Sequence, residues 1–122
     1  MTLVDTSVWV NHFRRTDATL MRLLADNLVT LHPFVLGEIA AGHLRNRRQT
    51  LGDLGLLRRA PLAQEAEVHI LLESHRLWGT GLGWVDLHLL TSAKLSGYNL
   101  YTADGALNAA AAALRLAGPP PE

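Results

Sequence analysis

Short apolar runs alternate along this chain with longer segments whose apolar residues recur at three- and four-residue spacing. Residues 2–5, 28–31 and 99–103 form runs of the first kind, which are typical of buried strands. The segments between them have the spacing of amphipathic helices. This pattern predicts helices over residues 6–14, 18–27, 33–42, 50–59, 63–78, 84–96 and an Ala-rich stretch after residue 104, with a last edge strand over residues 114–117.

Residues that start or stop helices support these bounds. Thr6 or Ser7 is expected to cap the first helix and Asp17 the second, because such side chains accept bonds from exposed helix N–H groups. Pro33 suits the first turn of a helix, and Gly97 suits the residue that ends one. Because strands alternate with helices, we expect an α/β fold with a parallel sheet, formed by residues 1–122 as a single domain.

The composition fits a folded domain and excludes several kinds of chemistry. Of the 122 residues, 48% are hydrophobic and 18% are charged, a mix that can bury a core without disulfides. The absence of Cys excludes a thiolate nucleophile and Cys-ligated metal sites. No apolar run is long enough to cross a bilayer, and the N-terminal residues do not resemble a signal peptide, so we expect a cytoplasmic protein with no membrane contact.

The charge balance limits how the protein can recognise anions. The chain has 11 basic and 11 acidic residues, so its formal net charge is zero and a strongly basic nucleic-acid coat is excluded. Ten of the 11 basic residues are Arg and the other is Lys94. The planar guanidinium group of Arg can donate two bonds at once to a phosphate or carboxylate. Recognition of an anionic partner is therefore expected to be local.

Four carboxylates stand at positions that surface polarity does not explain. Asp5 ends the first predicted strand, and Asp104 follows the predicted strand 99–103. Glu38 and Asp86 share a helix face with apolar residues, so we expect them to point toward the core or the sheet edge. A buried carboxylate is costly unless it is paired or bound to a metal. The carboxyl ends of parallel strands are also where ligands bind in open α/β sheets.

Together these carboxylates predict a metal site, although each has a simpler explanation. Several carboxylates in one crevice repel one another, and a divalent cation removes that conflict. Oxygen-only ligands favour Mg²⁺ or Mn²⁺, and such a site suits metal-assisted phosphodiester hydrolysis. The alternatives are that Asp5 and Asp104 only cap helices, that Glu38 pairs with an Arg, and that Asp86 caps its own helix.

The motifs around these acids resemble those of the PIN-domain ribonucleases, and among them the VapC toxins of bacterial toxin–antitoxin pairs. The resemblance covers essentially the whole chain and rests on four short segments in order. They are Val-Asp-Thr-Ser-Val-Trp at 4–9, Gly-Glu-Ile at 37–39, Gly-Trp-Val-Asp-Leu at 83–87 and Leu-Tyr-Thr-Ala-Asp at 100–104. The resemblance implies a three-layer α/β/α sandwich around a parallel sheet. It also implies a Mg²⁺- or Mn²⁺-dependent endoribonuclease in which water is the nucleophile.

The resemblance also implies a role for each site residue. The acidic metal-binding and catalytic positions are filled by Asp5, Glu38, Asp86 and Asp104. The hydroxyl residues Thr6, Ser7 and Thr102 match positions that hold a metal-bound water or orient a carboxylate. Asn108 lies one helical turn beyond Asp104 and is either an assisting residue or an ordinary exposed one.

Partners are implied by the same resemblance. It implies a homodimer, a cognate VapB-like antitoxin and an RNA substrate such as tRNA or ribosomal RNA. Arg45, Arg47 and Arg48 lie in the Gly- and Arg-rich segment 42–62, and they either contact RNA phosphates or form a solvated basic loop.

Two features of the sequence suggest other kinds of enzyme, and a protein that only binds is a further alternative. The Gly-rich loop 79–83 does not complete a dinucleotide-binding motif, since it lacks the third Gly and a preceding strand. An aspartyl phosphatase acting through Asp5 stays open, although Ser7 stands where such enzymes carry a second Asp. The remaining alternative is a catalytically weak PIN-like module that binds an antitoxin or RNA without cutting.

Overall fold

The computed structural model describes residues 1–119 and contains strands and helices in alternation. No helix in this part of the chain is both long and apolar enough to span a membrane. In chain order the elements are β1 (Thr2–Val4), α1 (Thr6–Arg14), α2 (Ala18–Ala25), β2 (Val29–Leu31), α3 (Pro33–Ala41), α4 (Arg47–Leu54), β3 (Arg58–Arg59), α5 (Glu65–Ser74), α6 (Trp84–Ser96), β4 (Asn99–Tyr101) and α7 (Gly105–Ala113).

The four strands form one parallel sheet in the order β3-β2-β1-β4. In the register, Leu3 pairs with Thr30 of β2 and with Leu100 of β4. All strands run the same way, so their carboxyl ends lie at one edge and Asp5 follows directly from β1 at that edge. The predicted α/β fold with a parallel sheet is confirmed.

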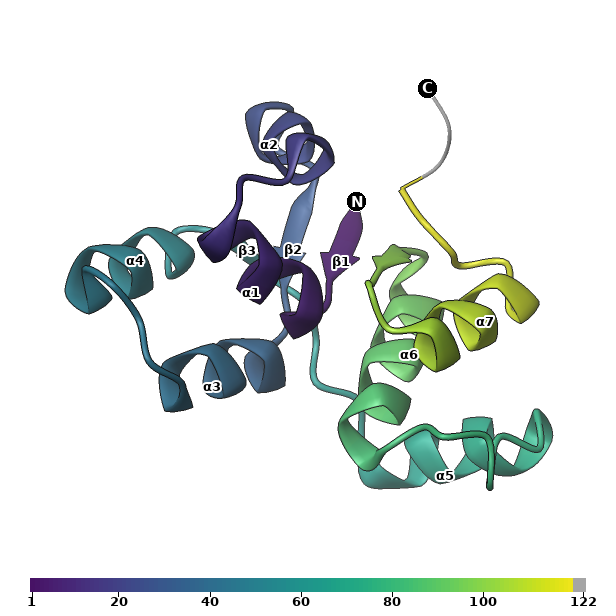
Figure 1. Cartoon of the computed structure of the whole chain (residues 1–122). Helices are drawn as coiled ribbons and strands as arrows, with labels where there is room; N and C mark the ends of the chain where they lie inside the picture. Colours follow the sequence, from purple (N-terminus) through teal and green to yellow (C-terminus); the bar gives the residue numbers. More distant parts are fainter. Residues whose placement is uncertain (120–122) are drawn as a thin grey trace.

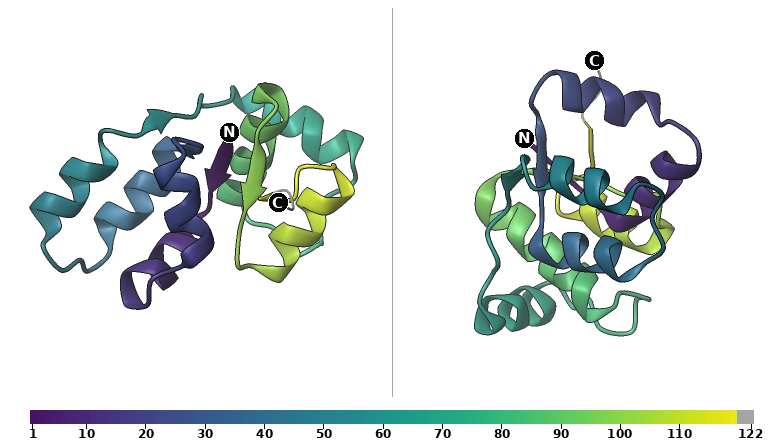
Figure 2. Two further views of the ribbon diagram at one scale, coloured as in Figure 1. Left: turned by 90° about the horizontal axis from the view of Figure 1, so that it is seen from above. Right: turned by 90° about the vertical axis from the view of Figure 1, so that its left-hand side faces the viewer.

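The helices cover both faces of the sheet. Figure 1 and Figure 2 show α1 and α7 on one face and α6, with α5 outside it, on the other. Helices α3 and α4 project to one side of the sheet, next to α1. This arrangement is the expected α/β/α sandwich. It directs the first residues of α1, α3, α6 and α7 toward the edge where the strands end.

Leucines fill the space between the layers. Leu3, Leu31, Leu89, Leu100 and Leu107 are completely buried, and they come from strands and helices of every layer. Burial of one such side chain stabilises the fold by about 1.5–3 kcal/mol. This core fixes the strands and helix starts that carry the candidate site.

Most predicted helix ends are confirmed. The Asp17 carboxylate accepts a bond from the Leu20 N–H at the start of α2, and Pro33 is the first residue of α3. Gly97 ends α6 with a φ of 71°, in the left-handed region that Gly adopts without strain. Thr6 and Ser7 are not caps, which corrects one prediction. Both lie inside α1, and their hydroxyls bond carboxylates instead.

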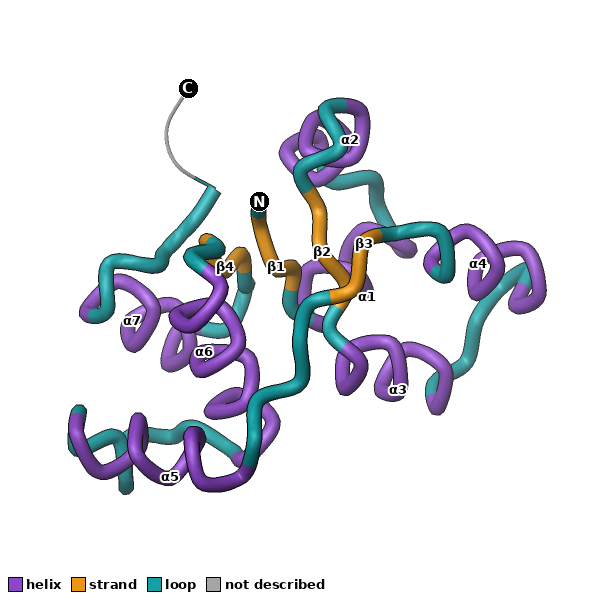
Figure 3. The backbone as a smooth tube through the Cα atoms, turned by 180° about the vertical axis from the view of Figure 1, so that it is seen from behind, coloured by secondary structure: helices purple, strands orange, loops and turns teal. Residues whose placement is uncertain are grey.

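The segment from residue 43 to residue 62 differs most from prediction. The predicted helix 50–59 is wrong, because α4 spans Arg47–Leu54 and a short strand, β3, follows. Both residues of β3 are exposed, so no apolar pattern marked them, and they form a strand only because they pair with Thr30 and Leu31 of β2. Figure 3 shows β3 as a short piece in the connection between α4 and α5.

Two further bounds are corrected. The predicted helix 63–78 is shorter, since α5 begins at Glu65 and ends at Ser74. It starts late because the backbone N–H of Gln64 bonds the Glu67 carboxylate as a helix cap, 2.8 Å away. The predicted edge strand 114–117 is only an isolated bridge between Leu100 and Ala117.

Candidate active site

Two hydroxyl groups fix the Asp5 carboxylate at the end of β1. Ser7 Oγ and Thr102 Oγ1 both donate to Asp5 Oδ2, over 2.7 Å and 2.8 Å. The Asp5 side chain is only 7% exposed and makes no bond that caps α1, although Asp5 stands at the cap position. The simpler explanation of Asp5 as a helix cap is therefore wrong. Its carboxylate is held by residues from two elements far apart in the sequence.

The backbone after β4 fixes the direction of these hydroxyls. Ser7 Oγ accepts from the Ala103 N–H at 3.0 Å, and Thr102 Oγ1 accepts from the Asp104 N–H at 3.0 Å. Each hydroxyl has one hydrogen, which it donates to Asp5. The 3.3 Å approach between the two hydroxyl oxygens is therefore a contact rather than a further bond. The result is a network that orients Asp5 rigidly.

Glu38 is held by α1, on the neighbouring side of the site. Thr6 Oγ1 donates to Glu38 Oε1 over 2.6 Å. This bond joins the first residue of α1 to the middle of α3, two helices that pack against each other. We expected Glu38 to point toward the core or the sheet edge. It is an exposed residue, and among residues 1–119 it pairs with no Arg.

Asp86 lies at the start of α6 and experiences the charge of the other three acids. Its Oδ2 accepts from the Gly83 N–H at 2.9 Å, so Asp86 does cap its own helix, as the simpler explanation allowed. Burial raises the pKa of the Asp86 carboxyl above its ordinary value of 3.8 and the Gly83 bond lowers it, while the negative charges of Asp5, Asp104 and Glu38 raise it further. The four acids therefore form one electrostatic group.

Asp104 opens α7 and caps it. Its Oδ1 accepts from the N–H groups of Ala106 and Leu107 at 2.9 Å and 3.3 Å. The prediction that Asp104 caps a helix is confirmed. The cap uses only one of the two oxygens of the Asp104 carboxylate. Asn108, one turn further along α7, is exposed and its side chain makes no hydrogen bond within residues 1–119.

Each of the four carboxylates keeps one oxygen without an internal partner. Within residues 1–119 the bonds above engage one oxygen of each acid, and no Lys or Arg pairs with any of them. Four free carboxylate oxygens are the donor set that Mg²⁺ or Mn²⁺ prefers. In this arrangement, no three His, Asp or Glu side chains of the described residues come close enough to share one metal ion.

The three Arg residues form a separate surface. Arg47 and Arg48 line an open hollow at the start of α4 with Asn46, Gln49 and Gly52, and Arg45 lies exposed just before it. In the described part of the chain, no hydrogen bond or ion pair joins them to the acidic group. The structure thus brings together the acids and hydroxyls, and it leaves the Arg residues on the projecting arm of α3 and α4.

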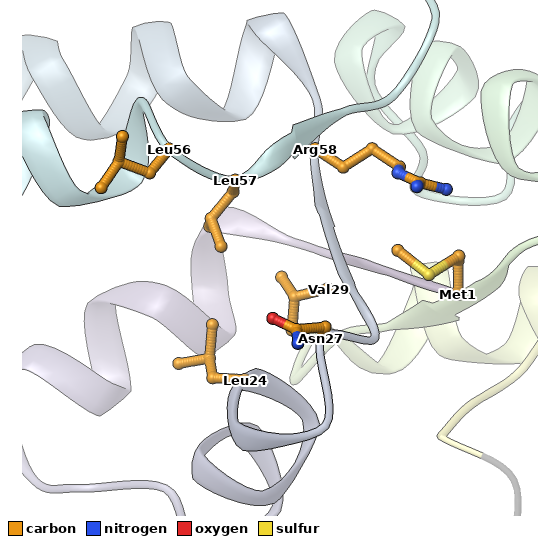
Figure 4. A pocket seen from close by; sticks show the side chains of 7 residues that line it. All are labelled: Met1, Leu24, Asn27, Val29, Leu56, Leu57 and Arg58. Carbon is orange, nitrogen blue, oxygen red and sulfur yellow. The ribbon is translucent and has the colours of Figure 1, made fainter.

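A small pocket lies at the other end of the sheet. Figure 4 shows its lining side chains, which come from the amino ends of β1, β2 and β3, from α2 and from the segment before β3. Its volume is about 230 Å³. The pocket lies at the amino ends of the strands, whereas Asp5 lies at their carboxyl ends. The pocket is therefore not part of the acidic group.

Sequence reasoning missed His32, which positions the helix that carries Glu38. His32 is completely buried, and its Nδ1 accepts from the Phe34 N–H at 3.0 Å, so its ring caps α3. Burial, together with the nearby His88, lowers the pKa of His32 to about 4, which keeps the ring neutral. The signal in the sequence was its place directly before Pro33, at the cap position of a predicted helix.

These features define a class: a parallel α/β domain whose acidic group lies where the strands end. The chain belongs to the PIN domain family, and the match to this family covers residues 2–113. Over 113 residues it is 45% identical to proteins named "Ribonuclease VapC32" from two strains of Mycobacterium tuberculosis, covering 92% of this chain and 91% of those proteins.

Solved structures show the same fold. One is Mycobacterium tuberculosis VapC20, described as a sarcin–ricin loop cleaving toxin, with a TM-score of 0.65, 24% identity and coverage of 90% of this chain and 95% of that chain. Another is FitAcB from Neisseria gonorrhoeae, with a TM-score of 0.63, 18% identity and coverage of 92% and 94%. At these identities the likeness concerns the fold alone.

Proposed function

We propose that this chain is a metal-dependent endoribonuclease toxin of the VapC kind, which cuts RNA phosphodiester bonds with water as the nucleophile. One observation carries the proposal: four acids at the carboxyl edge of a PIN-domain sheet each keep a free carboxylate oxygen. The 45% identity to Ribonuclease VapC32 over most of both chains supports the same activity.

The acidic residues would hold Mg²⁺ or Mn²⁺ through their free oxygens. Such a cation, when bound, lowers the pKa of water and neutralises charge on the phosphate. Two anchored hydroxyls fix the carboxylate of Asp5. Ser7 and Thr102 act as positioning residues for Asp5, and Thr6 does the same for Glu38. Asp86 and Asp104 contribute from the starts of two helices.

The proposal extends to the RNA substrate and to the protein partners. Arg45, Arg47 and Arg48 are exposed and available to bind RNA phosphates, and the substrate is a defined site in tRNA or ribosomal RNA. A cognate VapB-like antitoxin inhibits the protein, which is a homodimer of single PIN domains in the cytoplasm. The relatives named VapC, a kind of toxin, support the antitoxin partnership.

Cleavage by the purified protein tests this function. Wild type is incubated with total bacterial RNA in Mg²⁺, in Mn²⁺ and in EDTA, and new RNA ends are mapped. We expect discrete cleavage with either metal and none in EDTA. Asp5→Asn should lose cleavage at least a hundred-fold while keeping the hydroxyl bonds, since Asn retains an acceptor oxygen. Asp26→Asn, which removes an exposed carboxylate beyond α2, should cut like wild type.

The second candidate is a PIN-like module that binds RNA or an antitoxin without cutting. The observation in its favour is that no three acids of the described residues lie close enough to hold a metal as arranged. Binding of RNA by soluble wild type, with no new ends in either metal and no thermal shift with Mn²⁺, would support this candidate and contradict the nuclease.

A further inference from the structure

A row of touching rings runs across α3, α6 and α5, from the core to the surface. The ring of Phe34 lies 5.2 Å from that of His32 and 4.8 Å from that of His88, measured between ring centres. The ring of Trp84 lies 5.0 Å from His88 and 5.0 Å from His69. We call these five residues the aromatic row. They come from α3, α5 and α6 and the residue before α3.

The aromatic row belongs to the same helices as two of the acids. Phe34 lies one turn before Glu38 on α3, and Trp84 lies two residues before Asp86 on α6. Phe34 and Trp84 meet through His88, which lies one turn after Trp84. The ring contacts of His88 thus join α3 to α6, the two helices that carry Glu38 and Asp86.

The two ends of the row differ in exposure. His32 is completely buried and His88 is 5% exposed, whereas Trp84 is 42% exposed. The rings of His32 and His88 therefore form the inner, buried part of the row. At the outer end, His69 is also exposed and lies 3.6 Å from Glu65 one turn earlier on α5. The row thus presents a large aromatic side chain to solvent, supported from behind by buried rings.

Charge argues for an uncharged contact with RNA at this place. Four carboxylates repel a phosphate backbone, and within residues 1–119 no Lys or Arg pairs with them. A contact that does not depend on charge adds affinity beside the acids whether or not a cation is bound there. Stacking of an unpaired base on Trp or His has this property, and it is how proteins commonly bind single-stranded RNA.

We propose that Trp84, with His69 beside it, is a stacking platform for an unpaired base of the RNA substrate next to the acidic group. This inference rests on the proposed ribonuclease function. It assigns the rim of the site, on the α5–α6 side, to base contact, and the arm of α3 and α4 to phosphate contact. The substrate near the cut is accordingly single-stranded.

The test measures RNA affinity without cleavage, in the Asp5→Asn background. The probe is a fluorescein-labelled 12-nucleotide RNA of mixed sequence, followed by anisotropy. Trp84→Leu, which fills similar space without an aromatic face, should weaken binding about ten-fold, which corresponds to about 1.4 kcal/mol. Trp84→Phe should stay within about three-fold of the parent. Trp78→Leu is the matched control, because Trp78 is exposed and is in none of these ring contacts.

A second probe separates base stacking from other contacts. It is the same oligonucleotide with every base removed. The parent should bind this abasic probe more weakly than the normal one, and Trp84→Leu should bind it as the parent does. Equal loss of affinity for both probes, or no loss for either, would overturn the platform. Equal loss would assign Trp84 to folding, and no loss would show that Trp84 does not contact the RNA.

Cleavage assays keep this inference distinct from the proposed function. In the Asp5-containing protein, Trp84→Leu should raise KM with a smaller change in kcat, because the base contact positions substrate rather than reacting with it. If wild type cuts RNA and Trp84→Leu cuts it with an unchanged KM, the platform is wrong and the nuclease stands. If wild type cuts no RNA but the platform variants lose base-dependent binding, the nuclease is wrong and the base contact stands.

Discussion

Replacing Asp86 by Asn should stabilise the metal-free protein while impairing its function. The Asp86 carboxylate is half-buried and is repelled by Asp5, Asp104 and Glu38, as its raised pKa reflects. Asn keeps an oxygen that can accept the 2.9 Å bond from the Gly83 N–H, so the cap on α6 survives. The substitution therefore removes a repulsive charge and little else.

The size of the effect follows from the partial exposure of Asp86. Removing an unfavourable charge stabilises a protein by about 0.5–2 kcal/mol. Because water screens a half-buried carboxylate, we expect about 1 kcal/mol, which raises Tm by about 4 °C in a chain of this size. Glu73→Gln removes an exposed carboxylate on α5 and should change stability by less than about 0.5 kcal/mol.

The effect should depend on pH in a definite direction. A carboxyl whose pKa is raised on folding binds more protons in the native state, so its cost appears as pH rises above the ordinary value of 3.8. The advantage of Asp86→Asn over wild type should therefore be full at pH 7 and should vanish below that value. Acid destabilisation from buried His residues is common to both proteins and cancels in the comparison.

Differential scanning fluorimetry in EDTA and in excess Mn²⁺ measures both the effect of the charge and the stabilisation by bound metal. In EDTA the variant should melt higher than wild type. With Mn²⁺ at 100 times its Kd, wild type should gain about 2.7 kcal/mol, and the variant, which lacks one ligand, should gain clearly less. A variant that melts lower than wild type in EDTA at pH 7, or equal metal shifts in both proteins, would refute the reasoning.

Three further predictions concern the residues that support the site. Thr102→Val removes a bond to the charged Asp5 and should lower the free energy of unfolding in urea by about 2 kcal/mol, whereas Thr102→Ser should restore most of it; equal stability of the two variants would contradict this. Burial and the 2.7 Å bond to Asp17 raise the pKa of Tyr101 to about 12, so the free energy of unfolding should fall as the pH rises from 10 to 12. Tyr101→Phe should remove that slope in thermal unfolding measured over this pH range. His32 has a pKa of about 4 and binds fewer protons in the native state than in the unfolded chain, so the free energy of unfolding should fall as the pH is lowered from 6.5 to 4. His32→Asn keeps an acceptor for the Phe34 N–H and should flatten that fall. An unchanged slope in the variant would exclude His32 as the source.

The sequence predicted those parts of the fold that local patterns determine. The strands predicted at residues 2–5, 28–31 and 99–103 were found as the shorter strands β1, β2 and β4. The caps at Asp17 and Asp104 were found as well, because apolar runs and cap residues act within a few positions. Strand β3 could not be found in this way. Its two exposed Arg residues become a strand only by pairing with β2, which is a long-range effect.

The candidate site also has features that chain order determines and features that depend on long-range packing. The positions of Asp5 and Asp104 at strand ends were accessible to sequence reasoning, because chain order alone places them at one edge of a parallel sheet. The way Glu38 is held was not, since an exposed carboxylate bonded to Thr6 depends on how α1 packs against α3. The aromatic row was likewise invisible, because it joins residues of three helices that only the fold brings together.

Mapping of RNA ends in cells tests the central claim, that the acidic group is a metal-dependent nuclease site. Wild type, Asp5→Asn and Asp26→Asn are expressed in a bacterial host without antitoxin, and RNA 5′ ends are sequenced. We predict growth arrest and the same discrete new ends for wild type and Asp26→Asn, and neither for Asp5→Asn at equal soluble protein. Identical new ends from Asp5→Asn, or no new ends from soluble wild type that also leaves the host's RNA uncut in Mn²⁺, would contradict the claim.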